Sequence, residues 1–100
     1  MTTSYQILYW RDIPAQIKLR SGSQRLSRSL SDRFQQAIDS AAMLARTTST
    51  EDYLEEWRSS DWMEREGEPA QAADVLLAEI ETAYPPERLQ SLVLKQGREG

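Results

Sequence analysis

Two stretches near the start of the chain alternate between apolar and polar side chains, which is typical of half-buried β-strands. They are residues 4–10, SYQILYW, and residues 15–20, AQIKLR. The segment RDIP between them favours a turn, because aspartate bonds the backbone ahead of it and proline cannot donate to a ladder. The pattern predicts an antiparallel pair of strands. The second strand should have one dry face and one wet face that carries Lys18 and Arg20.

Helical spacing of apolar residues appears later, after a polar connection over residues 21–29. The first helix should begin after Ser31, its predicted N-cap, and run to Ala45. A polar break at residues 47–50 leads into a short second helix, and residues 58–67 alternate as a third strand. The short helix is expected to carry Tyr53, Leu54 and Trp57.

The clearest helix begins at Glu68-Pro69, because proline suits the first helical position. It should end before Tyr84-Pro85-Pro86, since a residue that precedes proline avoids the helical region. One further short helical turn is predicted over residues 89–94, before a frayed end.

These elements predict a small α+β fold with the order ββααβα. An antiparallel sheet of two to three strands should be covered on one face by two to three helices. We expect a single domain over residues 4–85, followed by a partly helical or frayed extension over residues 86–100.

The amino-acid composition excludes most of the familiar enzyme mechanisms. The chain has 100 residues, 39% of them hydrophobic and 28% charged, and it contains neither cysteine nor histidine. Disulfides, thiolate and imidazole metal ligands, thiol nucleophiles and histidine-assisted triads are therefore excluded. We assign no catalytic, cofactor-binding or metal-binding residue and no cofactor.

Charge is unevenly distributed along the chain. The net charge is −4, but residues 1–50 carry seven basic and three acidic residues, whereas residues 51–100 carry five and thirteen. The acidic cluster over residues 51–68 is interrupted by bulky aromatics, so we interpret it as a solvated face rather than a Mg²⁺ or Ca²⁺ site. The two halves should fold with arginines near carboxylates, which disfavours nucleic-acid binding by the basic set: Lys18, Arg20, Arg25, Arg28 and Arg33.

Three tryptophans and four tyrosines are more aromatic surface than a small core hides easily. If Leu8 and Trp10 occupy the sheet face away from the helices, they form an apolar patch with a basic rim of Lys18 and Arg20. Such a composition is enriched at protein interfaces. The alternative, equally open, is that the third strand or the C-terminal tail covers that face.

Several segments resemble a small bacterial domain family described as "virulence factor". They are YQILYWRDIPAQIKLRSG, SDRFQQAIDSAAM, YLEEWR and EREGEPAQAADVLLAEIETAYP, and together they span about residues 4–85. The most specific piece runs from Tyr9 to Gln16. The resemblance implies a domain that occurs alone or within larger conserved virulence factors, and it defines no catalytic residues.

We therefore expect a non-catalytic interaction module or small accessory subunit of a larger complex. The alternatives are a subunit of a cofactor-dependent enzyme, for example one that acts on folates, and a weak nucleic-acid binder. A larger protein partner is expected, with no membrane span and a cytoplasmic location; the sequence is also compatible with a homo-oligomer. The predicted partner-binding residues are Tyr9, Trp10, Arg11, Asp12, Lys18, Arg20, Trp57 and Trp62.

Overall fold

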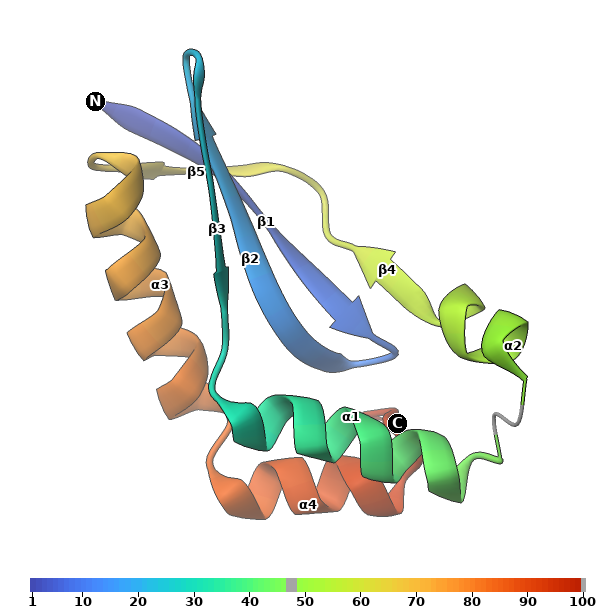
Figure 1. The fold of residues 1–100 in the computed structure, drawn as a ribbon. Helices are drawn as coiled ribbons and strands as arrows, with labels where there is room; N and C mark the ends of the chain where they lie inside the picture. Colours follow the sequence, from blue (N-terminus) through green and yellow to red (C-terminus); the bar gives the residue numbers. More distant parts are fainter. Residues whose placement is uncertain (47–48, 100) are drawn as a thin grey trace.

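The computed structural model describes residues 1–46 and 49–99, which fold into one antiparallel sheet and a set of flanking helices (Figure 1). The predicted α+β class is confirmed, but the described residues form five strands and four helices, more of each than expected. In chain order they are β1 (Thr2–Trp10), β2 (Ile13–Ser21), β3 (Gln24–Ser29), α1 (Asp32–Leu44), α2 (Thr50–Glu55), β4 (Trp57–Ser59), β5 (Met63–Glu66), α3 (Pro69–Ala83) and α4 (Pro86–Leu94).

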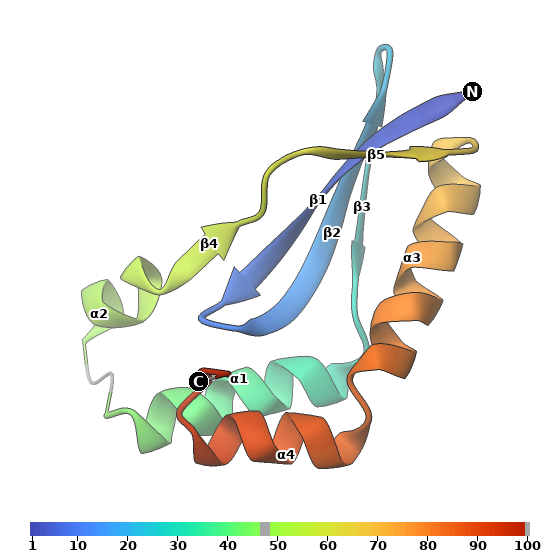
Figure 2. The ribbon, with the colours of Figure 1, turned by 180° about the vertical axis from the view of Figure 1, so that it is seen from behind.

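The sheet has the strand order β3-β2-β1-β4, and β5 also pairs with β1. Figure 2 shows β4 and β5 following one another along β1, β4 at the end of β1 and β5 near its start. The β1–β2 register places Ile7 opposite Ile17 and then shifts between Leu8 and Tyr9, so that Trp10 lies opposite Ile13. This irregularity breaks the simple alternation that residues 4–10 suggest, because a one-residue shift changes which side chains share a face.

One face of the sheet packs against the helices. Helices α1 and α3 contact β2, and α4 packs along α1 at the base of the molecule (Figure 1). The core combines the apolar face of β2 with the apolar stripes of the helices. Its largest completely buried side chains are Trp10, Phe34, Ile13, Ile17, Leu19 and Ile38.

Three segments of the sheet differ from the prediction, and one of them, the predicted third strand over residues 58–67, is divided into β4 and β5. Residues 24–29 form strand β3 rather than a polar connection, because a tight turn at Ser21–Gln24 folds them back onto β2 and places Leu26 opposite Leu19. Trp57 begins strand β4 rather than lying on the second helix, which ends at Glu55. Both strands are short and polar, so pairing with a neighbour decides their structure more than their own sequence does.

The region after residue 85 contains a nine-residue helix, longer than the predicted single turn. Pro86 starts α4, and Leu89 and Leu92 are buried against the core. Residues 95–99 then return beneath the β1–β2 turn, where the Asp12 backbone N–H donates to the Gly97 carbonyl over 2.8 Å. The predicted boundary at residue 85 stays a prediction, and residues 47 and 48 of the predicted polar break lie outside the described residues.

Candidate functional site

The most specific segment of the sequence, residues 9–12, lies at the end of β1 and in the turn that follows. Trp10 is completely buried, so it offers no surface to a partner. Its indole N–H donates to the Tyr53 carbonyl over 3.1 Å, and its ring stacks on that of Tyr53 with 5.8 Å between ring centroids. Trp10 is therefore covered by other parts of the chain rather than exposed at an interface. The covering segments are α2 and the C-terminal tail, residues 95–99.

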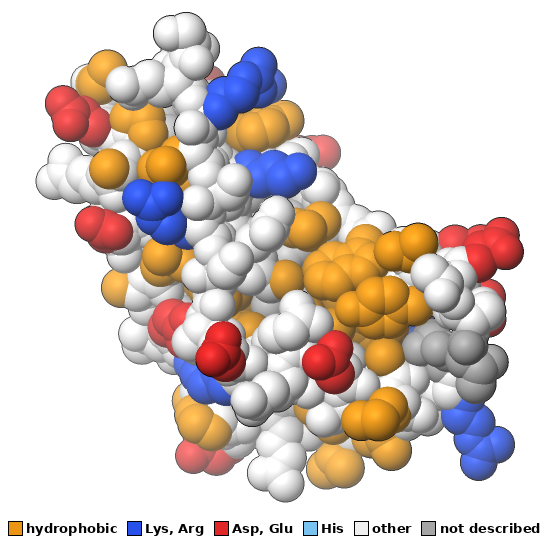
Figure 3. Space-filling model, in the orientation of Figure 1, with side chains coloured by type: hydrophobic (Ala, Val, Ile, Leu, Met, Phe, Trp, Pro, Cys, Tyr) orange, Lys and Arg blue, Asp and Glu red, His pale blue; other side chains and the backbone are white. Residues whose placement is uncertain are grey.

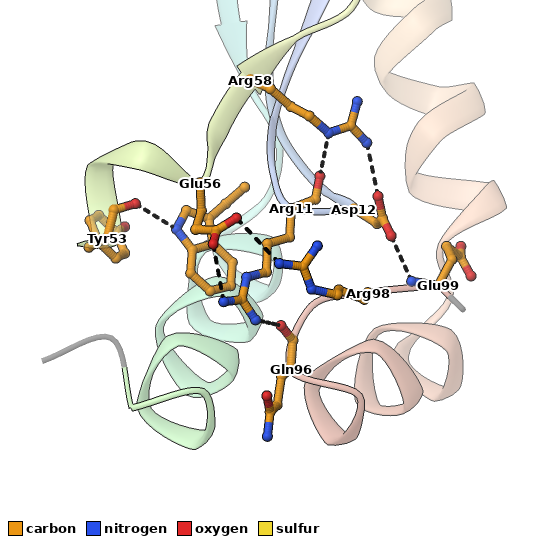
Figure 4. A network of polar contacts seen from close by, with 9 residues as sticks. Arg11, Asp12, Tyr53, Glu56, Arg58, Gln96, Arg98 and Glu99 are labelled. Carbon is orange, nitrogen blue, oxygen red and sulfur yellow. Dashed lines mark hydrogen bonds and ion pairs between the residues drawn. The ribbon is translucent and has the colours of Figure 1, made fainter. Parts of the chain in front are cut away.

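Arg11 connects three segments of the chain (Figure 4). It adopts a positive φ of 54°, and its backbone N–H donates to the Glu56 carbonyl over 3.0 Å. The guanidinium donates to the Gln96 carbonyl over 2.8 Å and forms an ion pair with Glu56 at 3.3 Å. The Arg98 side chain reaches the second oxygen of Glu56 at 3.6 Å. The Arg11 side chain is only 10% exposed, and its contacts join the turn to Glu56, between α2 and β4, and to the tail, residues 95–99.

Asp12 holds the tail from the other side of the turn. One carboxylate oxygen accepts from Arg58 over 2.9 Å, and the other accepts from the backbone N–H of Glu99 over 2.7 Å (Figure 4). The Glu99 N–H, followed by Arg58, keeps the pKa of Asp12 below its ordinary value despite partial burial. Arg11 and Asp12 are thus committed to contacts within the chain, and their role in the structure is to close the fold.

Tyr9 lines a polar hollow of about 420 Å³ beside this network. Tyr84, Arg58 and Arg88 also line it, and Glu99 pairs with Arg88 at its rim. Burial raises the pKa of both tyrosines, so their hydroxyls stay protonated at neutral pH. Neither hydroxyl makes a hydrogen bond within residues 1–46 and 49–99. The hollow is therefore rich in hydrogen-bond donors.

A second surface lies on the sheet face turned away from α1 and α3. Alternate residues of β2 place Lys18 and Arg20 on it, and the register puts Ser27 opposite Lys18 and Arg25 opposite Arg20. All four are exposed. Trp62, from the segment between β4 and β5, stacks beneath Arg20 with 4.0 Å from the guanidinium carbon to the ring centroid. We call these five residues the basic sheet face.

The basic sheet face contains a shallow depression. A depression of about 360 Å³ is lined by Lys18, Arg25, Ser27, Trp62 and Gln6. The Gln6 amide N–H donates to the Ser60 carbonyl over 2.9 Å, which fixes this side chain at the wall. The depression presents two cations and a hydroxyl, so its chemistry suits a negatively charged group.

The cations of the basic sheet face lack the acidic partners that most other arginines have, although Arg28 and Arg46 form no ion pair among the described residues either. Six arginines elsewhere form ion pairs within 4 Å: Arg11, Arg33, Arg58, Arg65, Arg88 and Arg98. Within the described part of the chain, no carboxylate lies that close to Lys18, Arg20 or Arg25. In Figure 3, blue side chains on the right-hand side of the β2–β3 hairpin stand without red ones between them. The expectation that arginines pair with carboxylates holds for most of the molecule and fails on this face.

The remaining candidates lie elsewhere. Trp57 is half-buried on β4, and its ring meets Tyr53 edge to face at a centroid distance of 6.0 Å. Figure 3 shows an apolar patch over the region of α2 and β4.

In the part of the chain that the structure describes, no three acidic side chains are arranged to hold a metal ion. No helix among those residues is long and apolar enough to cross a bilayer.

The structure brings together residues that lie in separate predicted segments of the sequence. The sequence predicts a polar connection around Arg25, whereas this residue lies on β3 directly opposite Arg20 of β2. The alternation of Arg25, Leu26 and Ser27 was the available indication of a strand, and a neighbouring Gly22 turn the indication of a hairpin. Trp62 was predicted as a partner-binding residue, but nothing in the sequence indicated its stacking on Arg20.

A family model described as "Virulence factor" matches residues 8–93. The match confirms the resemblance found in the sequence and extends it beyond Pro86, where the resemblance was expected to stop. No curated protein and no solved structure matches the chain significantly.

Proposed function

The chain belongs to the virulence factor family, and we propose that it is a non-catalytic docking module that binds an acidic region of a larger protein through the basic sheet face. The observation that carries the proposal is the directly opposed pair Arg20 and Arg25. Like charges opposite one another destabilise a sheet, and here no carboxylate within ion-pair distance offsets the repulsion among the described residues. An anionic partner would supply the missing charge.

The surroundings of this pair support a protein interface. Trp62 and two arginines belong to the residue types that contribute most to binding energy at interfaces. The stacking of Arg20 on Trp62 holds one guanidinium in place before a partner arrives, which reduces the entropy lost on binding. Steering by the three cations accelerates encounter with an acidic surface at low salt.

Affinity capture from a native lysate with charge-reversal variants tests the proposal. We expect a protein retained by the wild type to be lost with Arg20→Glu and kept with Lys95→Glu. The control removes an exposed cation at the end of α4 and changes the net charge by the same amount. Equal recovery of every protein by wild type and Arg20→Glu would refute docking at this face.

The hollow beside Tyr9 supports a second candidate, a subunit of a cofactor-dependent enzyme. Its two tyrosine hydroxyls have no partner among the described residues and fit a small ligand that accepts hydrogen bonds, and an anionic group on that ligand would compete with Asp12 and Glu99 for the two arginines. A thermal-shift screen with nucleotides and folates tests it, because a ligand that binds only the folded chain must raise its stability. Absence of any shift, or shifts that persist in Arg88→Gln, argues against this site.

A further inference from the structure

The spacing of the basic sheet face specifies the form of the acidic partner. We infer that this face binds an extended protein segment with carboxylates at alternate positions, a refinement that rests on the proposed docking function. The face offers two cross-strand receptor pairs in register: Arg20 with Arg25, and Lys18 with Ser27. Each pair combines at least one cation with a second hydrogen-bond donor, the combination that a single carboxylate requires.

The distance between the two pairs matches an extended chain. Lys18 and Arg20 are two residues apart on β2, so their Cα atoms lie about 6.6 Å from one another. Residues i and i+2 of an extended segment have the same separation and point the same way. A segment aligned with β2 therefore places one carboxylate between the two arginines and the next beside Lys18 and Ser27. Carboxylates on adjacent residues point to opposite faces and reach only one pair.

The depression runs across three strands. It is lined by Gln6 on β1, Lys18 on β2, and Ser27 and Arg25 on β3, and Trp62 adjoins it. Glu64 of β5 lies opposite Ser4 of β1, which in turn lies opposite Arg20, so negative charge flanks the β1 side of the face and disfavours an acidic segment there. The segment is thereby directed along β2 and β3.

A single-stranded nucleic acid also carries regularly spaced negative charges, but this face favours it less. Base recognition needs aromatic rings free to stack, and Arg20 covers one face of the Trp62 ring. Trp10 is buried and Tyr9 lines the other hollow. The net charge of −4 also opposes association with a polyanion.

Titration of the isotope-labelled protein with three probes, followed by NMR amide shifts, tests the inference. The first probe is a neutral-capped nine-residue threonine peptide with two glutamates at alternate positions. The second has the same two glutamates adjacent, and the third is a nine-nucleotide oligothymidylate. We expect the alternating peptide to shift the amides of residues 18, 20, 25 and 27 and to bind about fivefold more tightly than the adjacent isomer.

Variants localise the effect. Arg25→Gln should remove the difference between the two peptides, whereas Lys95→Gln should leave it intact, and the dispersed spectrum reports folding of each variant. Equal affinities of the two peptides for the wild type, or tighter binding of the oligothymidylate, would overturn the inference. The docking function itself is decided separately, by loss of the captured protein with Arg20→Glu.

Discussion

At the scale of single residues, the tail is held by close contact as well as by hydrogen bonds. Gly97 is buried with φ near 88°, and a Cβ atom at this position would lie 2.9 Å from the Trp10 ring and 3.3 Å from Arg11. Glycine is therefore required for two reasons, the backbone conformation and the space beside Trp10.

Gly97→Ala should lower the free energy of unfolding by about 2–4 kcal/mol, since strain of the left-handed backbone adds to overpacking against Trp10. Urea unfolding measures the loss. Gly22→Ala is the matched control, because φ is +58° there but the added methyl meets open space. The control should lose only about 1 kcal/mol, and equal losses would show that the contact with Trp10 contributes nothing.

Asp12 makes the closure of the fold dependent on pH. Its pKa is lower in the folded chain than in the unfolded one, mainly because the Glu99 N–H bonds the carboxylate. The stabilisation is therefore complete above the unfolded value of about 3.9 and is lost as the pH falls through the folded value.

Asp12→Asn should cost about 1–2 kcal/mol at pH 7, where it removes a charged acceptor from two hydrogen bonds. The difference from wild type should shrink as the pH falls below about 4. Urea unfolding at a series of pH values measures this. A difference that is constant with pH would mean that the charge of Asp12 does not hold the tail.

At the scale of elements, the start of α1 is stabilised by a residue distant in sequence. Ser31 is the residue before α1, as predicted, but its side chain does not cap the helix. Instead, its backbone N–H and hydroxyl donate to the Glu81 carboxylate of α3 over 2.7 and 2.8 Å. Arg33 donates to the same carboxylate over 3.0 Å, so one side chain joins two helices.

Glu81→Gln should lower the free energy of unfolding by about 1 kcal/mol, because neutral oxygen is a weaker acceptor for Ser31 and Arg33. Glu79→Gln on the same helix breaks a solvent-exposed pair with Arg65 and should cost less. Chemical denaturation of the two variants compares them. A loss for Glu79→Gln as large as that for Glu81→Gln would contradict the joining role of Glu81.

The elements that the sequence predicted well are those with a strong local pattern. Helix α3 begins at Pro69 and ends before Tyr84, because prolines at both ends determine its limits. Strand β3 was missed because five of its six residues are polar and only pairing with β2 orders them. The same holds for the candidate site: Lys18 and Arg20 followed from alternation, whereas Arg25 reaches them by hairpin pairing and Trp62 by a contact distant in sequence.

At the scale of the whole molecule, positive charge is paired over most of the surface and left unpaired on the basic sheet face. Most arginines pair with carboxylates, whereas the basic sheet face has none within ion-pair distance among residues 1–46 and 49–99. Like charges that lie close together without a carboxylate partner lower the stability of a protein. Such unfavourable arrangements are typical of functional surfaces.

Arg25→Glu should therefore raise the free energy of unfolding by roughly 0.2–1 kcal/mol, since it converts a repulsive pair with Arg20 into an attractive one. The gain should fall at about 0.5 M salt, because exposed charges are screened. Arg28→Glu is the control: Arg28 lies opposite Ile17 rather than a cation, so it should gain less. A lower free energy of unfolding for Arg25→Glu would show that repulsion between Arg20 and Arg25 does not destabilise the wild-type sheet.

The contact between the β1–β2 turn and the tail also has a consequence for how the chain acquires its structure. Asp12 and Glu99 are 87 positions apart, so their hydrogen bond closes a long loop of the chain. During synthesis, Trp10 stays uncovered by Gly97 until nearly all of these residues have left the ribosome. The β1–β2 pairing closes a much shorter loop, so we expect this hairpin to form before Gly97 covers the Trp10 indole.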